Sequence, residues 1–599
     1  HRIQLQQLRR THLMPEKDAE QRALARSILS PERNGTLSAE QMLKAWQKIK
    51  RNVRSLHERI FFRPLLAAVS TLSRDEVVLS EQAAQDRLAA LGYRDPCGAM
   101  RHIKALTTGL SRSADIQRHL MPVLLGWFAR GVDADAGLLG FRIVSESLGS
   151  TSWYLRMLRD SPAAAERLSQ LLSSSRLMTD LLEDASASIA WLDKVADLKP
   201  LGEEALASEI SSLLARHADA AEAMRAVRYL RRRETLRTAM GWTLGIVDIE
   251  DTCAGLAAID ECTIGAALQI ALRELQAAPE STEPAEAAEP TEAAEPAEAE
   301  EIAGEKLLTR IAVIGMGRLG GAENGFGSDA DVMFVHEPLD GADEDAAQEQ
   351  AARIVNRTLA LLKQPVKPAI RAERPLEVDA DLRPEGKQGA IVRSLDSYRS
   401  YYERWAETWE FQALTRARPI AGDEALGEAF VELIDPYRYP ATFTPEQVQQ
   451  IRRMKARVEN ERMPHGADRT RQLKLGRGGL SDVEWLVQLV QLRHAHAVPG
   501  LRTTSTLKAL NAAVEAGLIE AADAEILSGA WLLATKIRGG NVLRGVRQSD
   551  TLPSGRDDLE AIARWCGYPA GSARALEEDY LRQTRNARKV YERLFFEEL

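Results

Sequence analysis

The stretch IAVIGMGRLGGAENGFGSDADVMFV, residues 311–335, decides how the central part of this chain folds. It predicts an apolar strand, a glycine-rich turn and a second strand that opens with an Asp-x-Asp pair. Side chains two residues apart in a strand share a face, so Asp329 and Asp331 would point to one side while Val332 and Phe334 anchor the strand on the other. A glycine turn suits a phosphate, and two convergent carboxylates suit Mg²⁺, which proteins commonly hold through one or two carboxylates plus substrate phosphates.

Two other interpretations of this stretch remain open at this point. Gly315, Gly317 and Gly320 match the dinucleotide fingerprint G-x-G-x-x-G, and Asp340 lies about 20 residues on, where a ribose-binding acid is expected. That fingerprint needs a crossover helix directly after the glycines, and the Asn and Gly residues that follow interrupt one. The Asp pair could also be a solvated turn or open a calcium loop, but no third ligand follows at calcium-loop spacing.

A third carboxylate is offered by RPLEVDADLRPEG, residues 374–386. On a strand through residues 376–382, Glu377, Asp379 and Asp381 would share one face. The segment follows a helical stretch, residues 346–363, so it can return beside the strand of the Asp pair. Three acids on one face can also simply be solvated.

Composition limits the class of protein. The 599 residues are enough for three or four domains, and 45% of them are apolar. No run of about 18 uncharged apolar residues occurs and the start HRIQLQQLRR is no signal peptide, so we expect a soluble, cytoplasmic protein without a membrane partner. The four cysteines show no C-x-x-C spacing, which argues against zinc and disulfides and favours core thiols. No basic, aromatic-interleaved patch indicates nucleic acid.

The net charge of −9 arises in one segment. Residues 279–301, PESTEPAEAAEPTEAAEPAEAEE, contain nine Glu and no Lys or Arg, so the remainder of the chain is neutral. Repeated Pro, low hydrophobicity and one-sided charge predict a disordered acidic loop or linker. A passive spacer is favoured over an acidic recruitment arm.

Most of the remaining sequence predicts helix, notably residues 38–60, 104–128, 140–194, 203–241 and 504–546. Residues 38–60 open with Ser38 and Gln41 at capping-box spacing. They carry a predicted core stripe at intervals of three and four, namely Met42, Trp46, Ile49, Val53, Leu56 and Ile60. In KLGRGGLSDVEW, residues 474–485, Ser481 and Glu484 predict a second capping box, so its glycines are expected chiefly to turn the chain into a helix. Lys474 and Arg477 are candidate phosphate neighbours.

Five patterns together resemble the glutamine synthetase adenylyltransferase family: G-x-G-R-L-G-G-x-E (315–323), G-S-D-x-D (327–331), V-D-x-x-L-R-P (378–384), T-W-E-x-Q-A-L-x-x-A-R-P-x-A-G-D (408–423) and K-L-G-x-G-G-x-x-D-x-E (474–484). The resemblance runs over nearly the whole chain. It implies a mostly α protein with an inserted α/β nucleotidyltransferase domain like that of DNA polymerase β, a helical linker before it and a helical bundle after it.

The resemblance also implies the site. Asp329 and Asp331 would bridge two Mg²⁺ ions, Asp379 would be the third carboxylate, and ATP would be the substrate. The expected nucleotide-binding residues are Gly315, Gly317, Arg318, Gly320, Gly321 and Ser328. Two positions depart from the family: Met316 stands where the turn usually has Gly or Ser, and Asp381 stands where many relatives carry Arg.

An internal repeat relates the two ends of the chain. KRNVRSLHERIFF (50–62) parallels TRNARKVYERLFF (584–596), with a second match upstream of each at nearly equal spacing. We therefore expect the chain to open in the tail of a first repeat unit. The expected organisation is that tail (1–66), a central helical linker and regulatory region (67–240), the nucleotidyltransferase domain (241–435) and a C-terminal bundle (436–599).

By the same resemblance, the chain would keep the half that attaches AMP to a tyrosine of glutamine synthetase, and would lack the half that removes it. A PII signalling protein and glutamine would be effectors that report nitrogen status. An alternative is that the chain is chiefly a regulatory helical module that binds PII, with catalysis secondary.

Overall fold

The computed structural model describes residues 14–15, 17–28, 38–57, 81–109, 111–149, 151–277, 304–371, 373–545 and 549–598. They belong to two compact units, residues 1–130 and 131–599. The acidic segment 279–301, for which disorder is expected, lies outside the described residues, and so does about half of the expected repeat tail. The four-part division of the chain remains a prediction.

The described part of the first unit is helical, with α2 (Asp18–Arg26), α3 (Ala39–His57), α5 (Glu81–Leu91), α6 (Pro96–Thr107) and α7 (Arg112–Ala129). The capping box that opens α3 is confirmed: the Gln41 amide donates to Ser38 Oγ and the Ser38 amide donates to Gln41 Oε1, both at 3.1 Å. The predicted core stripe is wrong in its middle, because Met42 is buried but Trp46 is 45% exposed. Within the described residues, the short helix α2 packs on this end of α3 through Leu24 and Ala25, and the contact reaches Met42 of the stripe.

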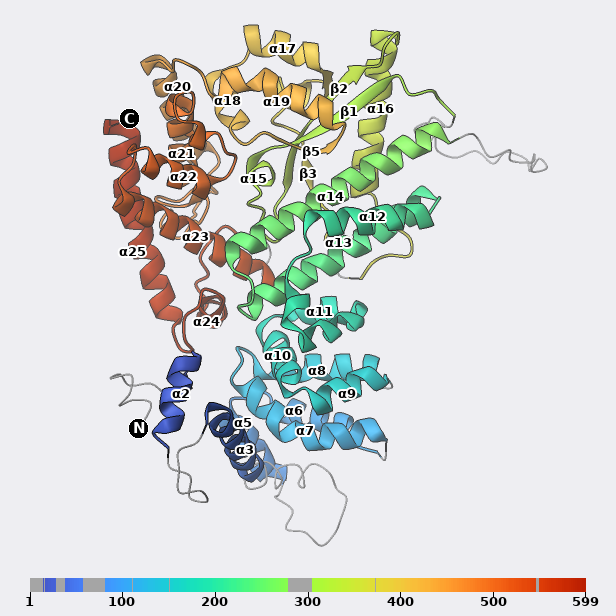
Figure 1. Cartoon of the computed structure of the whole chain (residues 1–599), viewed down its shortest axis with the longest axis vertical. Coiled ribbons are helices and arrows are strands. Elements are labelled where there is room, and N and C mark those ends of the chain that lie inside the picture. Colours follow the sequence, from blue (N-terminus) through green and yellow to red (C-terminus); the bar gives the residue numbers. More distant parts are fainter. Residues whose placement is uncertain are drawn as a thin grey trace, which may run out of the picture. The chain divides into compact units, whose positions relative to one another are not determined.

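The second unit begins with helices that correspond to the predicted segments 140–194 and 203–241 (Figure 1). They are α8 (Ala134–Leu148), α9 (Ser152–Asp160), α10 (Pro162–Ser174), α11 (Arg176–Asp184), the 3₁₀ segments η2 (Ser186–Asp193) and η3 (Val195–Leu198), α12 (Glu203–Arg216) and α13 (Ala220–Thr243). The next helix, α14 (Ile249–Gln276), lies outside both predicted segments. By length and composition α14 could cross a membrane, but 72% of its most apolar window is buried within the protein. It packs on α12, α13, α16 and β5, so its apolar sequence is that of a core helix.

A mixed five-stranded sheet lies at the centre of this unit. Its strands are β1 (Thr309–Gly315), β2 (Ala330–Pro338), β3 (Val378–Asp379), β4 (Val392–Ser394) and β5 (Arg418–Gly422). The order is β3-β2-β1-β5. Strand β4 pairs with β2 on the same edge as β3, but further along β2. Strand β1 is antiparallel to β2 and β5, whereas β3 and β4 run parallel to β2.

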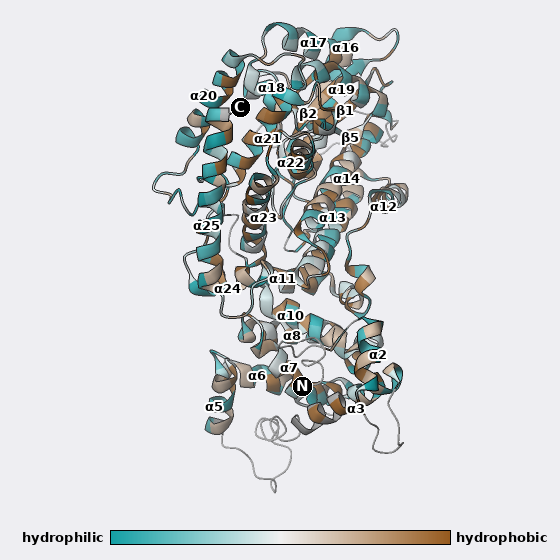
Figure 2. Cartoon of the chain, turned by 60° about the vertical axis from the view of Figure 1, so that its left-hand side comes forward, coloured by the Kyte–Doolittle hydropathy of each residue, from teal (hydrophilic) through white to brown (hydrophobic). Residues whose placement is uncertain are grey.

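Helices cover both faces of the sheet because β1 and β2 are apolar at alternate positions on each side. On one face Val313 and Phe334 pack with α14 and α16 (Glu344–Lys363). On the other, Ile314 and Val335 pack with α17 (Leu395–Arg404), α18 (Thr408–Leu414) and α19 (Glu424–Arg438). Figure 2 shows β1 and β2 as hydrophobic, in contrast to the hydrophilic α20.

The C-terminal part is a helical bundle with its own core. It contains α20 (Pro445–Glu461), α21 (Leu480–His494), the 3₁₀ segment η5 (Pro499–Leu501), α22 (Thr506–Glu515), α23 (Ala521–Leu543), α24 (Arg556–Trp565), α25 (Ala573–Glu592) and the π-helical η6 (Arg593–Glu598). The predicted helical segment 504–546 is confirmed, with one break between α22 and α23. All four cysteines are free, and Cys97 is exposed rather than a core thiol.

Candidate functional site

Three carboxylates meet at the edge where β2 begins. Asp329 directly precedes β2, and Asp331 is its second residue. The chain leaves β2, forms α16 and returns as β3, which places Asp379 opposite Asp331 in a parallel pair. The expected return of the third acid beside the Asp pair is therefore confirmed.

The expected strand through residues 376–382 is wrong in its extent, because β3 contains only two residues. The chain turns after Asp379, and the Asp381 amide donates to Asp379 Oδ1 at 2.7 Å. Asp381 then forms ion pairs with Lys387 at 3.2 Å and Arg383 at 3.7 Å. Its charge is thus partly neutralised by its own loop, and it does not continue the acidic face of β3.

The turn between β1 and β2 is as tight as its glycines suggest. Gly317 has φ of 52°, and a Cβ atom there would lie 2.1 Å from Asp331 Oδ2. Glycine is required because it tolerates positive φ and leaves room for the carboxylate. The Met316 amide donates to the Asp331 carbonyl at 2.8 Å, which fixes the turn to the start of the acidic strand.

This turn also excludes the dinucleotide interpretation. The helix after the glycines, α15 (Gly317–Gly320), has four residues, and β2 returns antiparallel to β1. A dinucleotide fold needs a full crossover helix and a parallel second strand. The fingerprint match of Gly315, Gly317 and Gly320 is therefore incidental.

The other predicted nucleotide-binding residues surround the turn. A Cβ atom at Gly320 would lie 1.8 Å from the Arg416 carbonyl, so this glycine allows close packing on the segment before β5. Ser328 Oγ accepts from the Gly325 amide at 3.0 Å. Arg318 Nε donates to the Glu323 carbonyl at 2.8 Å, while its two terminal nitrogens are buried without a hydrogen-bond partner among the described residues. Their contact with nucleotide remains a prediction.

The electrostatics of the three carboxylates differ from those of surface acids. Burial raises the pKa of Asp331 to about 6; Lys474 opposes the rise, and Asp379 and Asp329 add to it. The pKa of Asp329 is also raised, by burial first and then by Asp379 and Glu377, again against Lys474. Clustered carboxylates held partly out of water favour a bound cation, because it relieves their mutual repulsion.

The helical bundle supplies the basic groups that face these acids. Lys474 is exposed and, among the described residues, its ammonium forms no hydrogen bond or ion pair. Arg538 on α23 also lowers the pKa of Asp329 and is held by Asp550 at 2.6 Å. Arg538 was missed in the sequence, where nothing in the helical pattern of α23 distinguishes it; the glycine-rich motif did indicate Lys474.

Glu484 links the bundle to the glycine turn. Its Oε1 lies 3.9 Å from Arg318 Nη1 and accepts from Trp531 Nε1 at 3.4 Å. The Arg318 guanidinium also lies over the Trp531 ring, 5.4 Å from its centroid. Arg318 is therefore held from the bundle side, although it belongs to the sheet domain in sequence.

The predicted capping box at the start of α21 is wrong. Gly479 is the N-cap residue and no side chain caps this end. Ser481 instead accepts from Lys455 Nζ at 3.2 Å, beside an ion pair of 2.8 Å between Lys455 and Asp482, both 1% exposed. The expectation that the glycines chiefly turn the chain agrees with Gly478, which has φ of 73° and whose added Cβ would lie 1.9 Å from the Thr584 carbonyl.

A second buried cluster joins the sheet to the bundle directly. Glu323, in the loop after the glycine turn, forms an ion pair of 3.0 Å with Arg416 and accepts from Thr506 Oγ1 at 2.8 Å. Arg416 also donates to the Thr504 carbonyl and to Thr506 Oγ1. Both charges are buried and fully partnered, so the cluster fixes where α22 meets the loop that leads to Asp329.

The site fits a divalent metal only together with a substrate. Among the residues that the structure describes, no three His, Cys, Asp or Glu side chains are arranged to hold an ion by themselves. Mg²⁺ keeps several waters and is commonly held by one or two carboxylates plus phosphates, so Asp329 and Asp331 with a triphosphate satisfy its needs. The raised pKa of both acids is consistent with a role as cation ligands.

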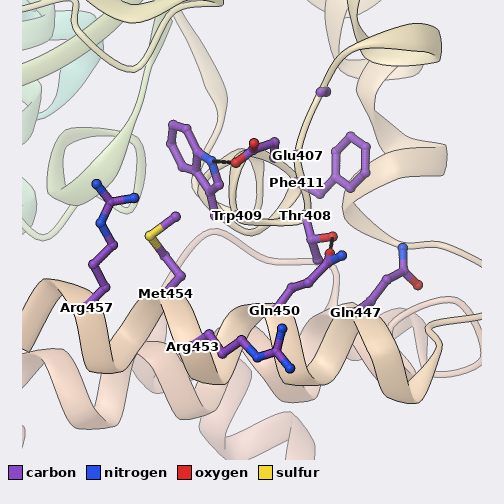
Figure 3. A pocket seen from close by; sticks show the side chains of 10 residues that line it. Glu407, Thr408, Trp409, Phe411, Gln447, Gln450, Arg453, Met454 and Arg457 are labelled. Carbon is purple, nitrogen blue, oxygen red and sulfur yellow. Dashed lines mark hydrogen bonds between the residues drawn. The ribbon is translucent and has the colours of Figure 1, made fainter.

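A cavity of about 650 Å³ lies between α18 and α20, away from the three carboxylates (Figure 3). Trp409, Phe411 and Met454 give it apolar walls, while Arg453 and Arg457 line the side of α20. Trp409 Nε1 donates to Glu407 at 2.8 Å. None of the three strand carboxylates lines this cavity, so we do not assign it to the same site.

Comparison with known proteins gives two family matches. The model for glutamate-ammonia ligase adenylyltransferase matches residues 165–433, which include the sheet and the three carboxylates. The model for GlnD PII-uridylyltransferase matches residues 1–61 and 452–595, the two stretches that contain the internal repeat.

Curated relatives match the chain from end to end. A protein of Leifsonia xyli subsp. xyli is 48% identical over 602 residues, which cover 100% of this chain and 56% of the relative. A protein of Streptomyces avermitilis is 48% identical over 605 residues, 100% of this chain and 58% of the relative. A protein of Corynebacterium glutamicum is 39% identical over 602 residues, which cover 100% of this chain and 55% of the relative. All three are named bifunctional glutamine synthetase adenylyltransferase/adenylyl-removing enzyme, and the chain spans a little over half their length.

Proposed function

Since this chain belongs to the family of the bifunctional glutamine synthetase adenylyltransferase/adenylyl-removing enzymes, we propose that it transfers AMP from ATP to a tyrosine of glutamine synthetase. The observation that carries the proposal is the register of β2 and β3, in which Asp331 and Asp379 are direct neighbours. We further propose that residues 241–435 form a nucleotidyltransferase domain like that of DNA polymerase β. The linker 67–240 and the bundle 436–599 would flank it.

The metal ligands in this proposal are Asp329, Asp331 and Asp379. When bound, Mg²⁺, expected as two ions, would neutralise charge on the triphosphate and on the attacking oxygen. The backbone amides of the turn at Gly317 would approach the triphosphate, since no side chain blocks them. Arg318 in the turn and Lys474 from the bundle would add positive charge beside the triphosphate.

The chain's residues then act by position and charge. The tyrosine oxygen attacks the α-phosphorus in line, the bond to the β-phosphate oxygen breaks, and pyrophosphate leaves. Asp379, at the edge of the site and exposed, would accept the tyrosine proton. Asp331, which is more buried, would stay with the nucleotide. No side-chain nucleophile is needed, because positioning and electrostatic stabilisation supply the acceleration.

The direct test follows label from α-³²P-ATP into glutamine synthetase. The chain should incorporate label in a Mg²⁺-dependent manner, and Asp329→Asn should remove incorporation without changing the circular dichroism spectrum. Asp340→Asn is the matched control, because Asp340 is an exposed acid of the same domain outside the site. Near-normal incorporation by Asp329→Asn would refute the assignment, and it would leave the regulatory-module alternative as the better account.

The direction of the chemistry needs a separate test. We propose that this site attaches AMP and does not catalyse its efficient phosphate-dependent removal. Pre-adenylylated glutamine synthetase should release little ADP with phosphate, while slow ATP formation with pyrophosphate is allowed as the reverse of the forward step. Robust phosphate-dependent ADP release that disappears in Asp329→Asn would show that one site performs both reactions.

We also propose that a PII protein and glutamine regulate the reaction. Support comes from the match of residues 1–61 and 452–595 to the GlnD PII-uridylyltransferase model. Label incorporation measured with and without each effector tests this, and no response to either would reject it. The substrate ATP is consistent with a cytoplasmic location.

A further inference from the structure

A basic cavity adjoins the catalytic edge, and Ser328 and Asp329 of the proposed nucleotide site are among the residues that line it. It encloses about 310 Å³ and is bounded by α11, α13, the loop before β2 and the segment before β3. Its apolar wall consists of Leu177, Leu181, Phe326, Pro375 and Val542. Its polar wall carries Arg228, Arg231, Arg232 and Arg374, with Asp329, Glu373 and Glu377. The volume is at the lower end for sites that bind small molecules.

Two of the four arginines have carboxylate partners. Arg228 forms an ion pair with Glu373, and Arg231 forms one with Asp260 at 2.7 Å. Arg231 also donates to the Arg374 carbonyl at 2.7 Å. The positive charges of these two guanidinium groups are therefore already neutralised by carboxylates of the protein.

Arg232 is different. It is 5% exposed and has no carboxylate partner among the described residues. Its Nε donates to the Arg371 carbonyl at 2.8 Å, and Nη2 donates to the carbonyls of Asp180 and Leu181 at 3.2 and 3.0 Å. Its Nη1 is buried with no hydrogen-bond partner in the described part of the chain. A buried donor left unpaired is costly. Burial lowers the pKa of Arg232, and the carboxylates of Asp184 and Glu373 oppose that shift without forming an ion pair with it.

Arg374 supplies a second charge at the same cavity. Its side chain is exposed, and it forms no ion pair within the described residues. Asp329 and Glu377 line the same cavity, as does Glu373, which is paired with Arg228. These acids repel a phosphate dianion about twice as strongly as a singly charged anion at the same place, so the cavity favours a single negative charge at Arg232 and Arg374.

We propose that this cavity binds a small organic monocarboxylate, with the carboxylate on Arg232 Nη1 and Arg374 and the apolar body against Leu181, Phe326 and Val542. Two guanidinium groups match the two oxygens of one carboxylate. Asp329 belongs to both this cavity and the catalytic edge, so an occupant would lie against the wall that holds the proposed metal ligand.

Isothermal titration of the full chain with benzoate tests the proposal, with benzyl alcohol as the neutral probe of similar shape. Benzoate should bind saturably and benzyl alcohol at least tenfold more weakly. Arg232→Gln should weaken benzoate binding at least tenfold. Arg371→Gln is the matched control, because Arg371 is a nearby exposed arginine whose side chain pairs with Glu183 and does not line the cavity, and it should bind as the parent does.

Arg374→Gln is a second test that does not depend on whether the buried variant Arg232→Gln folds. The Arg374 side chain is exposed and forms no ion pair within the described residues, so its replacement should not disturb the fold. It should also weaken benzoate binding, with an unchanged melting temperature. Equal binding of benzoate and benzyl alcohol, no saturable binding of benzoate, acetate or hexanoate, or inorganic phosphate binding at Arg232 in place of benzoate would each overturn the proposal. Binding is measured without turnover, so failure of the proposed adenylyl transfer leaves this result unaffected.

Discussion

Asp331→Asn should stabilise the metal-free protein while it removes activity. Burial raises the pKa of this carboxyl from 3.8 to about 6 in the folded chain. A group with a raised folded pKa costs nothing below its unfolded pKa, and it destabilises the fold as the pH rises through the folded pKa. The shift of roughly two units corresponds to about 3 kcal/mol at most, because one unit is about 1.4 kcal/mol. Since the side chain is partly exposed, we expect about 1–3 kcal/mol.

The assay compares melting temperatures of the variant and the parent between about pH 3 and pH 8 in EDTA. The two should coincide near pH 3, below the unfolded pKa of 3.8, where the carboxyl is mostly protonated in both the folded and the unfolded chain. They should separate between pH 4 and pH 6, between the unfolded and folded pKa, and differ by roughly 2–4 °C above pH 7, with the variant higher, given the small shift per kcal/mol in a large unit. Asp340→Asn, at an exposed site, should show no such separation.

Addition of Mg²⁺ and a non-hydrolysable ATP analogue should reverse the order. The parent gains binding energy through its ionised carboxylate, and the variant lacks that ligand charge. A variant that is less stable than the parent at pH 8 in EDTA would refute the burial argument. A pH-independent difference would show that packing, not ionisation, sets the effect.

The remaining predictions concern the other parts of the site. Asp379→Asn should abolish turnover but retain more Mg·ATP binding than Asp331→Asn, measured by calorimetry; equal loss would contradict the division of roles. Gly317→Ala should lower kcat by ~100-fold, because its Cβ would displace the Asp331 carboxylate; unchanged kcat would show that the turn adjusts. Lys474→Gln should raise the KM for ATP more than it lowers kcat, and a pure kcat loss would contradict a ground-state contact. Deletion of residues 280–300 should leave kcat and the melting temperature nearly unchanged, and a large fall in either would show that this run docks on the protein.

Much of the central domain follows from the sequence alone. The glycine-rich turn, the acidic strand and the following helix could be placed because each depends on local chemistry. The turn depends on backbone freedom at Gly317, the strand on alternation along β2, and the helix on periodicity through α16, after which the third acid returns. The capping box of α3 could be predicted for the same reason, since Ser38 and Gln41 satisfy each other's amides within one turn.

Predictions from local sequence patterns were wrong where a residue distant in sequence binds the same side chain. Ser481 and Glu484 have capping-box spacing, but Lys455 binds Ser481, and Arg318 and Trp531 engage Glu484. The strand of acids ends early because the Asp381 amide closes a turn on Asp379. In α3 the apolar stripe is largely exposed, because periodicity reports an apolar face and cannot say whether another helix covers it.

The sequence by itself determined most of the elements, the acidic pair and the resemblance to the adenylyltransferase family, because short-range patterns encode them. Only the tertiary structure decided that Asp379 lies opposite Asp331, that Lys474 and Arg538 from the bundle face the acids, and that Arg232 has an unpaired donor in a cavity next to them. These juxtapositions join residues separated by tens to hundreds of positions. They depend on strand register and helix packing, which are set by the burial of the whole core and leave no periodic mark near any one residue.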